Sequence, residues 1–399
     1  MFGTSISHLI RPVLPLLPIL IAAGCSCNQD YAFPKANLVS FDAPENFGAW
    51  LSLDATPGGN QIAMAYYDIA DGALGFAVGT PQPDGTVLWA HEPVDGYKGD
   101  DGLDRSNRGK YASMKVADDG TVWIAYHDVD QGGLYVSQRR GGPGSWSEPE
   151  KVDIGGGMAP SAGEWASLAL DADNHPVIAH HDGGTGTLRL TRFDGTDWSS
   201  SEIFAGDDFV GVGDTGEEFT VDSNVGTYAR LLIDDGTEYI AFYDATFKTL
   251  NLLEGAAGAY THTVVDQTGD AGQWPSMWTD GSQLKIAYHD VGNQDLVIAT
   301  RAAGVWSRET VDNGDYRGAD TEIFMRDGKI SVTYFDGFNN NQVLATNDGG
   351  WVQQTIGGDD AAVGFHNEVV EINGVYWLAS YDYTNQTLFI IGDNFISGS

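Results

Sequence analysis

The sequence is poor in cysteine, in basic side chains and in long apolar runs. Its 399 residues include two cysteines, Cys25 and Cys27, so no framework of disulfides stabilises the fold. Lysine and arginine number 20 against 56 aspartates and glutamates, which gives a formal net charge of −36. Such a charge repels nucleic acid and anionic membrane surfaces, and we exclude both as partners of the folded part.

One long apolar run is present, over residues 12–23, after a start whose one strongly basic residue is Arg11. The run is too short to span a bilayer and is typical of the hydrophobic part of a signal peptide. Ala22-Ala23-Gly24-Cys25 resembles a bacterial lipobox, which implies a lipoprotein signal peptide at 1–24 and lipidation of Cys25. An ordinary signal peptide cut nearby is the alternative. We expect an exported protein of the cell envelope, on the outer membrane, that touches the membrane through its lipid anchor only.

The strongest pattern is an internal repeat. Each copy has an aromatic residue, a small residue that is often serine, an alternating apolar strand, a Gly/Asp turn and a second strand that ends in aspartate. Examples are YASMKVADDGTVWIAYHD from Tyr111 and WPSMWTDGSQLKIAYHD from Trp274. Seven copies are present, and they start near residues 50, 111, 165, 228, 274, 320 and 366.

Each copy continues into a third strand and then into a fourth that begins at an aromatic residue. Period-two alternation and turn residues make each unit a four-stranded antiparallel sheet that cannot bury both its faces alone. Radial stacking buries those faces, so we predict an all-β, seven-bladed β-propeller over residues 36–399, after a short linker at 25–35. The last copy lacks a fourth strand, and we expect residues 36–42 to complete it and close the ring.

The repeat resembles a group of bacterial and archaeal secreted propeller repeats with the pattern G-x-[WY]-x-S-L-A-L-D-x-x-G-x-P-H-I-x-Y-Y-D. This resemblance implies the architecture and leaves the activity open, because the fold hosts many unrelated functions. Turns such as 346–351 and 193–198 also look like degraded versions of the Asp-box turn of sialidases.

Two sets of repeated polar residues invite a metal-site hypothesis. An aspartate at the end of every second strand more often accepts N–H groups of its own turn, and we expect this role for all seven. His127, His181 and His289 occupy positions that hold tyrosine in other copies, which favours half-buried rings. A transition-metal site with His366 is the alternative, without any short ligand spacing to support it. The aspartates are Asp68, Asp128, Asp182, Asp244, Asp290, Asp336 and Asp382.

Three copies place a charged residue where the other four place serine. Arg230, Glu322 and Glu368 stand in these positions, and we expect all three at the mouth of the central channel. A charge in such a position needs a partner or a ligand. The first interpretation is an ion pair of Arg230 with a glutamate. The serines are Ser52, Ser113, Ser167 and Ser276.

The second interpretation of these charges is a ligand site. Arg230 would bind an anionic or hydroxyl-rich ligand such as a sugar together with Arg108 and Arg317 from adjoining links, with Glu322, Glu368 and His366 nearby. If the protein is a glycosidase, Glu322 and Glu368 are its catalytic carboxylates. Pairing of both with arginine, or a wide separation, would argue against that role.

Two acidic, glycine-rich loops could hold calcium. They cover residues 99–107 and 206–224 and lie in links from a fourth to a first strand, which are longest around the first four blades. We therefore expect the binding site on the face that carries these links. Solvated acidic loops are the alternative to calcium, because neither matches a known calcium-loop spacing. The possible ligands are Asp100, Asp101, Asp104, Asp207, Asp208 and Asp214.

Three functions fit these observations. The first is a recognition module that binds a glycan or a protein through its loop-rich face, which the absence of a recognisable catalytic motif favours. The second is a sialidase-like glycoside hydrolase, and the third is a structural protein of the envelope. The sequence predicts no cofactor other than possible calcium.

Overall fold

The computed structural model describes residues 46–97, 107–157, 161–213, 215, 217–358 and 360–396. The predicted signal peptide, Cys25, the linker and the predicted closing strand at 36–42 lie outside the described residues. Among the residues that are described, no helix has the length and apolar character needed to cross a membrane.

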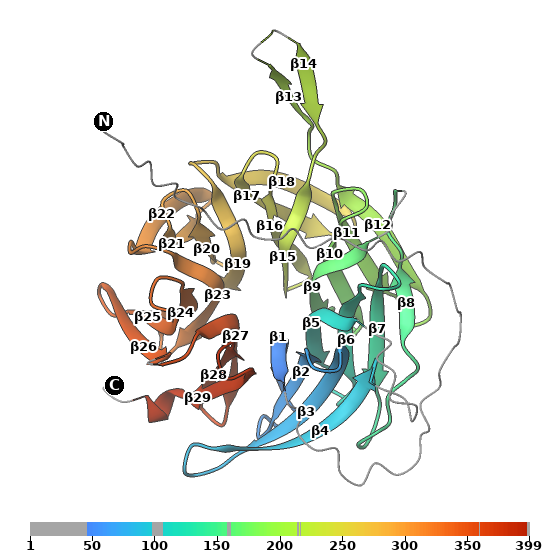
Figure 1. The fold of residues 1–399 in the computed structure, drawn as a ribbon, viewed down its shortest axis with the longest axis vertical. Coiled ribbons are helices and arrows are strands. Elements are labelled where there is room, and N and C mark those ends of the chain that lie inside the picture. Colours follow the sequence, from blue (N-terminus) through green and yellow to red (C-terminus); the bar gives the residue numbers. More distant parts are fainter. Residues whose placement is uncertain are drawn as a thin grey trace, which may run out of the picture. The chain divides into compact units, whose positions relative to one another are not determined.

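Seven antiparallel sheets form the blades of a β-propeller, which confirms the predicted fold class (Figure 1). Blade 1 contains β1 (Phe47–Ala55), β2 (Ile62–Asp68), β3 (Ala73–Pro81) and β4 (Val87–Asp95). Blade 2 contains β5 (Arg108–Val116), β6 (Val122–Asp128), β7 (Gly133–Arg139) and β8 (Glu150–Asp153). Blade 3 contains β9 (Ala162–Leu170), β10 (Pro176–Asp182), β11 (Thr187–Phe193) and β12 (Trp198–Phe204).

The second half of the chain continues in the same way. Blade 4 contains β15 (Val225–Asp234), β16 (Thr237–Asp244), β17 (Thr249–Ala256) and β18 (Ala259–Asp266). Blade 5 contains β19 (Ala271–Thr279), β20 (Gln283–Asp290), β21 (Asp295–Ala302) and β22 (Val305–Asp312). Blade 6 contains β23 (Arg317–Arg326), β24 (Lys329–Asp336), β25 (Asn341–Asn347) and β26 (Trp351–Gly357). Blade 7 has three described strands, β27 (Val363–Ile372), β28 (Val375–Asp382) and β29 (Thr387–Gly392), followed by the 3₁₀ helix η1 (Asp393–Phe395).

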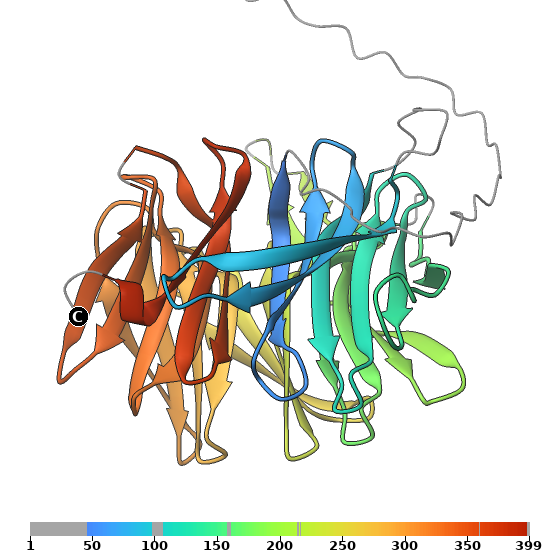
Figure 2. The same cartoon turned by 90° about the horizontal axis from the view of Figure 1, so that it is seen from below.

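The first strand of every blade lies innermost, around the central channel (Figure 1). Because the strands are antiparallel and in sequence order, links from one blade to the next share a face with the turns between second and third strands. We call this the mouth face. Figure 2 shows the blades edge-on, with the other turns at the opposite ends of the strands.

The core lies between neighbouring blades. Leu74 and Phe76 of β3 pack against Met114, Ile124 and Tyr126 of blade 2, and all five are buried. Burying one such side chain stabilises the fold by about 1.5–3 kcal/mol. Each blade therefore depends on its neighbour for a covered face, as the repeat predicts.

A glycine at the second residue of each first strand allows the blades to approach closely. Gly272 has a φ of 114°, and a Cβ there would lie 2.6 Å from the Cα of Leu250 in the preceding blade. Any other side chain would push the two blades apart. Six further glycines occupy the same position, with φ between 92° and 117°: Gly48, Gly109, Gly163, Gly226, Gly318 and Gly364.

Buried polar pairs also join neighbouring blades. The Tyr288 hydroxyl donates to Asp266 at the end of the preceding blade, at 2.6 Å, and Tyr126 and Tyr334 donate likewise to Asp95 and Asp312. Each pair gives a buried or half-buried carboxylate a hydrogen-bond donor from the next blade.

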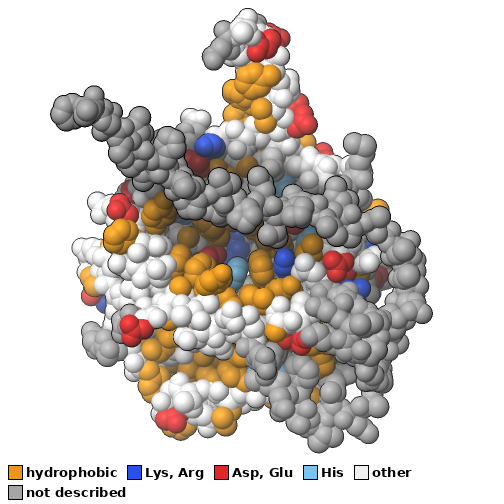
Figure 3. All heavy atoms as spheres, viewed as in Figure 1, with side chains coloured by type: hydrophobic (Ala, Val, Ile, Leu, Met, Phe, Trp, Pro, Cys, Tyr) orange, Lys and Arg blue, Asp and Glu red, His pale blue; other side chains and the backbone are white. Residues whose placement is uncertain are grey.

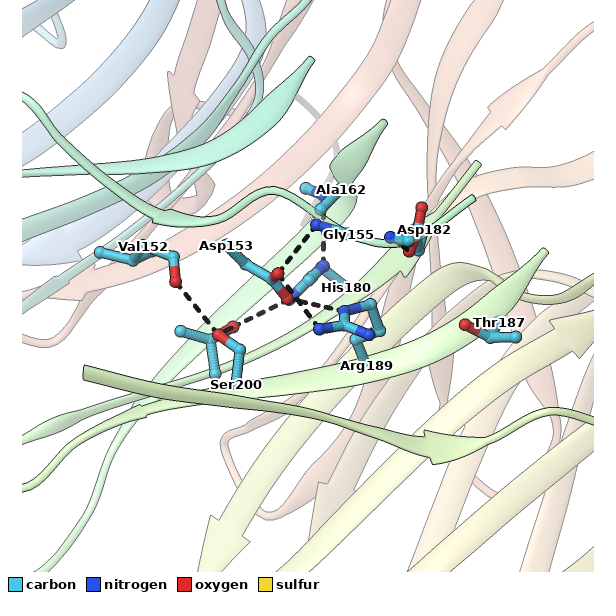
Figure 4. Close-up of polar contacts among 12 residues, drawn as sticks. Val152, Asp153, Gly155, Ala162, His180, Asp182, Thr187, Arg189 and Ser200 are labelled. Carbon is cyan, nitrogen blue, oxygen red and sulfur yellow. Dashed lines mark hydrogen bonds and ion pairs between the residues drawn. The ribbon is translucent and has the colours of Figure 1, made fainter. Parts of the chain in front are cut away.

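In blade 3 a histidine replaces that tyrosine. His180 Nδ1 accepts the Gly163 N–H, and its Nε2 lies 3.5 Å from Asp153, which also binds Arg189 (Figure 4). Burial lowers the pKa of His180 to about 4, so the ring is neutral at physiological pH. This carboxylate–histidine–arginine cluster is thus a variant of the same junction between blades.

A hairpin of β13 (Phe209–Val212) and β14 (Glu218–Val221) is inserted between blades 3 and 4 and projects outward from the ring (Figure 1). The ring of Phe209 lies 6.2 Å from that of Phe219. Val210, Val212 and Val221 are also exposed, so the hairpin presents apolar side chains to solvent.

Candidate functional site

Seven equivalent residues surround the channel at the mouth face, and we call them the mouth ring. Each is the fourth residue of an innermost strand, and each is partly exposed. Wherever two neighbouring members both have an aromatic or imidazole side chain, the centroids of these side-chain rings lie 4.8–5.8 Å apart. Figure 3 shows apolar side chains around the centre of this face, with basic, acidic and histidine side chains among them. The members are Trp50, Tyr111, Trp165, Tyr228, Trp274, Asp320 and His366.

The backbone of the mouth ring is strained in the same way seven times. All seven residues have φ between 42° and 55°, in the left-handed region that non-glycine residues avoid. The pairing of first and second strands shifts register here, as between Ala49 and Ser52, which marks a β-bulge. Bulges redirect side chains, and strained backbone persists where the surrounding structure requires it, often at functional sites. The strain therefore supports a functional role for the ring.

Below the mouth ring, the three exceptional charges meet across the channel. Arg230 of blade 4 forms ion pairs with Glu322 of blade 6 and, at 3.5 Å, with Glu368 of blade 7. Burial raises the pKa of Glu322 to about 7, although Arg230 lowers it. The predicted ion pair of Arg230 is confirmed, and it includes both glutamates.

The same geometry argues against Glu322 and Glu368 as the two carboxylates of a glycosidase. Their side chains are 18% and 15% exposed and both pair with one guanidinium. A nucleophile and an acid need to flank the scissile bond of a sugar, whereas these two carboxylates flank Arg230.

The two other predicted arginines are also paired. Arg108 lies 2.9 Å from Asp95 and 3.0 Å from Asp128, and Arg317 pairs with Asp312 and Asp336 in the same way. In both cases one aspartate belongs to the preceding blade and the other to the arginine's own blade. The structure thus places Arg108 and Arg317 at junctions between blades and does not show them in contact with Arg230.

Asp320 breaks the series of rings, and sequence reasoning missed it. Burial raises the pKa of its carboxyl to about 7, and the N–H of His366 lowers it in part. Burial also lowers the pKa of His366 to about 4, so its imidazole is neutral beside Trp50, with ring centroids 5.0 Å apart. The signal was available, because Asp320 starts the one copy of the repeat that has neither an aromatic residue nor histidine at that position.

The repeated aspartates cap their own turns, as predicted. Asp68 Oδ1 accepts the N–H groups of Ala70 and Asp71, and Asp336 does the same for Phe338 and Asn339. Equivalent bonds occur at Asp128, Asp182, Asp244, Asp290 and Asp382.

The three repeated histidines join blades. Nδ1 of His127, of His181 and of His289 contacts the carbonyl of the first residue of the next blade. Tyrosine in the same position reaches a side chain of the next blade, as Tyr243 does with Asp270 at 2.6 Å. These contacts confirm that histidine and tyrosine are interchangeable here. The prediction of half-buried rings was wrong, because all three histidines are buried between the blades.

Two of the six proposed calcium ligands, Asp207 and Asp208, lie within the described residues. Asp207 is exposed, and Asp208 accepts the Ser223 N–H at 2.9 Å at the base of the hairpin. Asp100, Asp101, Asp104 and Asp214 lie outside the described residues. Elsewhere in the described part of the chain, one group of side chains has a geometry suited to a metal: Asp171, Asp173 and His175. Asp171 Oδ1 accepts the N–H groups of Asp173 and His175, so this group forms a turn.

A hollow of about 480 Å³ lies between blades 4 and 5, away from the mouth ring. Trp306 and Arg308 line it, and Arg308 pairs with Asp266. We base the candidate site on the mouth ring instead, because the ring combines sevenfold repetition, backbone strain and an exceptional carboxylate.

Comparison with known proteins adds support for the fold. No protein-family model matches the chain. No curated protein sequence matches it either. Among solved structures, polysaccharide lyase Uly1 matches with a TM-score of 0.52 at 12% identity, over 91% of this chain and 92% of that chain. A prolyl endopeptidase matches with a TM-score of 0.51 at 11% identity, and this chain spans 50% of its length.

A leech intramolecular trans-sialidase is a more distant neighbour, with a TM-score of 0.44 at 12% identity over 92% of this chain and 69% of that chain. At such low identities the likenesses to the lyase and the endopeptidase show a shared propeller fold and nothing about activity.

Proposed function

We propose that this propeller is a carbohydrate-recognition module whose ligand binds at the mouth ring. The observation that carries the proposal is the unbroken series of six neighbouring rings from His366 through Trp50 to Trp274, all partly exposed at one opening. Aromatic walls with a few polar groups are the usual composition of a small-molecule site. The C–H faces of sugar rings fit aromatic surfaces, while their hydroxyls need polar partners.

Polar groups are present beside the rings. Glu164 accepts the Ser161 hydroxyl at 2.7 Å, and Asp320 interrupts the series. The pairing of Glu322 and Glu368 with Arg230 favours recognition over hydrolysis.

A glycan array tests the proposal. The purified protein should bind at least one class of oligosaccharide, and Trp165→Ala should weaken that binding about tenfold or more, as expected for a central aromatic contact. Trp351→Ala is the matched control, because Trp351 is also partly exposed but lies in the outermost strand of blade 6. Absence of binding across the array, or equal binding by both variants, would contradict the proposal.

We also propose that Cys25 anchors the protein in the cell envelope. The support is the lipobox-like sequence Ala22-Ala23-Gly24-Cys25 after an apolar run. Cys25→Ala should move the protein from the membrane fraction to the soluble fraction of its host. An unchanged distribution would contradict lipidation at this cysteine.

A further inference from the structure

The three arginines that the structure describes near the channel are already paired. Arg230 faces Glu322 and Glu368, and Arg108 and Arg317 each bridge two aspartates. An anionic sugar would have to displace a carboxylate from an arginine before it gained an ion pair. These three arginines therefore give little support to binding of sialic or uronic acids.

One side of the mouth ring combines aromatic surface with negative charge. Trp165, Tyr228 and Trp274 form an arc with centroid separations of 5.3 and 4.8 Å. Asp320 follows Trp274 in the ring, whereas the charge of Glu164 acts on Tyr111, the neighbour of Trp165 outside the arc. Burial, and then the charges of Asp320 and Asp270, raise the pKa of the Tyr228 phenol to about 12, which shows that carboxylates lie within electrostatic reach of this arc.

The opposite side of the ring already holds a cation. The ammonium of Lys110 lies 5.5 Å from the centre of the Trp50 ring and 5.9 Å from that of Tyr67. In the described residues, no lysine or arginine makes such a contact with the arc of Trp165, Tyr228 and Trp274. Within the part of the chain that the structure describes, the arc thus offers aromatic surface that no lysine or arginine covers in this way.

The carboxylates beside the arc differ in how they are paired. Asp270 forms an ion pair with Lys248 at 3.1 Å. For Asp320, no pairing with a lysine or arginine is found among the described side chains, and its neighbour His366 is neutral. A partly exposed carboxylate without a cationic partner is stabilised when a ligand brings a positive charge to it.

We propose that the mouth ring selects oligosaccharides of amino sugars with free amines, the ammonium lying against the Trp165–Tyr228–Trp274 arc with Asp320 as its counter-charge. Aromatic faces and carboxylates both attract an ammonium, and a desolvated site strengthens both attractions. The inference rests on the proposed function, since it names the sugar class for the same site.

Isothermal titration calorimetry with three defined hexasaccharides tests it. The probes are β-1,4-linked glucosamine, its N-acetylated counterpart and a galacturonate oligomer, all at neutral pH. We expect the glucosamine oligomer to bind about tenfold more tightly than the acetylated one, which is 1.4 kcal/mol, and the galacturonate oligomer to bind most weakly. Asp320→Asn should remove most of this preference, whereas Trp165→Ala should weaken both glucosamine-based ligands.

Asp173→Asn controls for general attraction of a polycation to an acidic protein, because Asp173 is exposed in the turn between β9 and β10 on the opposite face. If the acetylated oligomer binds equally well, or if Asp320→Asn keeps the full preference, the inference is wrong while the proposed function stands. If Asp173→Asn reduces binding as much as Asp320→Asn, the attraction is non-specific and the inference is again wrong. If none of the three sugars binds and the glycan array is also blank, the proposed function itself fails.

Discussion

The blades are of two kinds, and the difference lies in one residue of each innermost strand. In four blades this residue is a serine whose hydroxyl accepts an N–H from the next blade, as Ser167 does from Leu231 at 2.9 Å. The same bond runs from Met114 to Ser52, from Leu168 to Ser113 and from Ile323 to Ser276. In the other three blades Arg230, Glu322 and Glu368 pair across the channel. One position can thus join neighbouring blades or join distant ones.

The largest effect should come from breaking the cross-channel cluster. Arg230→Met leaves two largely buried carboxylates without a partner and should lower the free energy of unfolding by about 3 kcal/mol. Urea unfolding measures this change. The triple variant Arg230→Met, Glu322→Gln, Glu368→Gln should regain most of the loss, because it removes the charges together. A single variant as stable as the original protein would show that the cluster does not hold the blades.

A smaller loss should follow from breaking one serine junction. Ser167→Ala leaves the buried N–H of Leu231 without its acceptor, which costs about 1–2 kcal/mol. Ser199→Ala, at an exposed residue of the outermost strand β12, should change stability by less than about 0.5 kcal/mol. Equal effects of the two substitutions in urea unfolding would contradict the role of the hydroxyl.

The pH dependence of stability should report on Asp320. Its pKa is raised from 3.8 to about 7 in the folded state, so between these values the folded protein binds more protons than the unfolded chain. The free energy of unfolding therefore falls as pH rises through this window. Asp320→Asn stays uncharged, and its Tm should exceed that of the original protein by about 2 °C or more at pH 8, with a smaller difference at pH 4. Parallel Tm profiles would contradict this prediction.

The smallest effect should come from converting one kind of blade into the other. Glu322→Ser removes half of the pairing of Arg230 but offers Val369 of blade 7 the acceptor that Ser276 offers Ile323. We expect a net change in unfolding free energy below about 1 kcal/mol, with slower hydrogen exchange at the Val369 amide. Unchanged exchange there would mean that serine alone does not create the junction.

The features that recur among the copies of the repeat could be predicted from the sequence. The seven blades, the turn-capping aspartates and the exchange of histidine for tyrosine all follow from aligning the copies, because each depends on neighbours close in sequence or one repeat away. An ion pair of Arg230 with one glutamate was predicted because the three charges are exceptions at one position, and the structure adds the second glutamate.

The mouth ring was harder to foresee. Simple alternation along a strand does not reveal the bulge that turns Trp50 and its equivalents towards the opening, since the left-handed backbone appears only in the folded ladder. The partners of Arg108 were missed for a related reason, because Asp95 ends a strand of the preceding blade and Asp128 a strand of its own. Such three-way junctions depend on how two blades are angled, which the repeat period does not give.

The left-handed backbone of the mouth ring also affects how a ligand binds there. The backbone sets the direction of each Cα–Cβ bond, and contacts between neighbouring rings, whose centroids lie 4.8–5.8 Å apart, restrict the rotamers of their side chains. The loss of conformational freedom is therefore completed when the chain folds. The binding surface should therefore have the same conformation before and after a ligand binds. Binding then needs little rearrangement, and the site selects ligands by their shape.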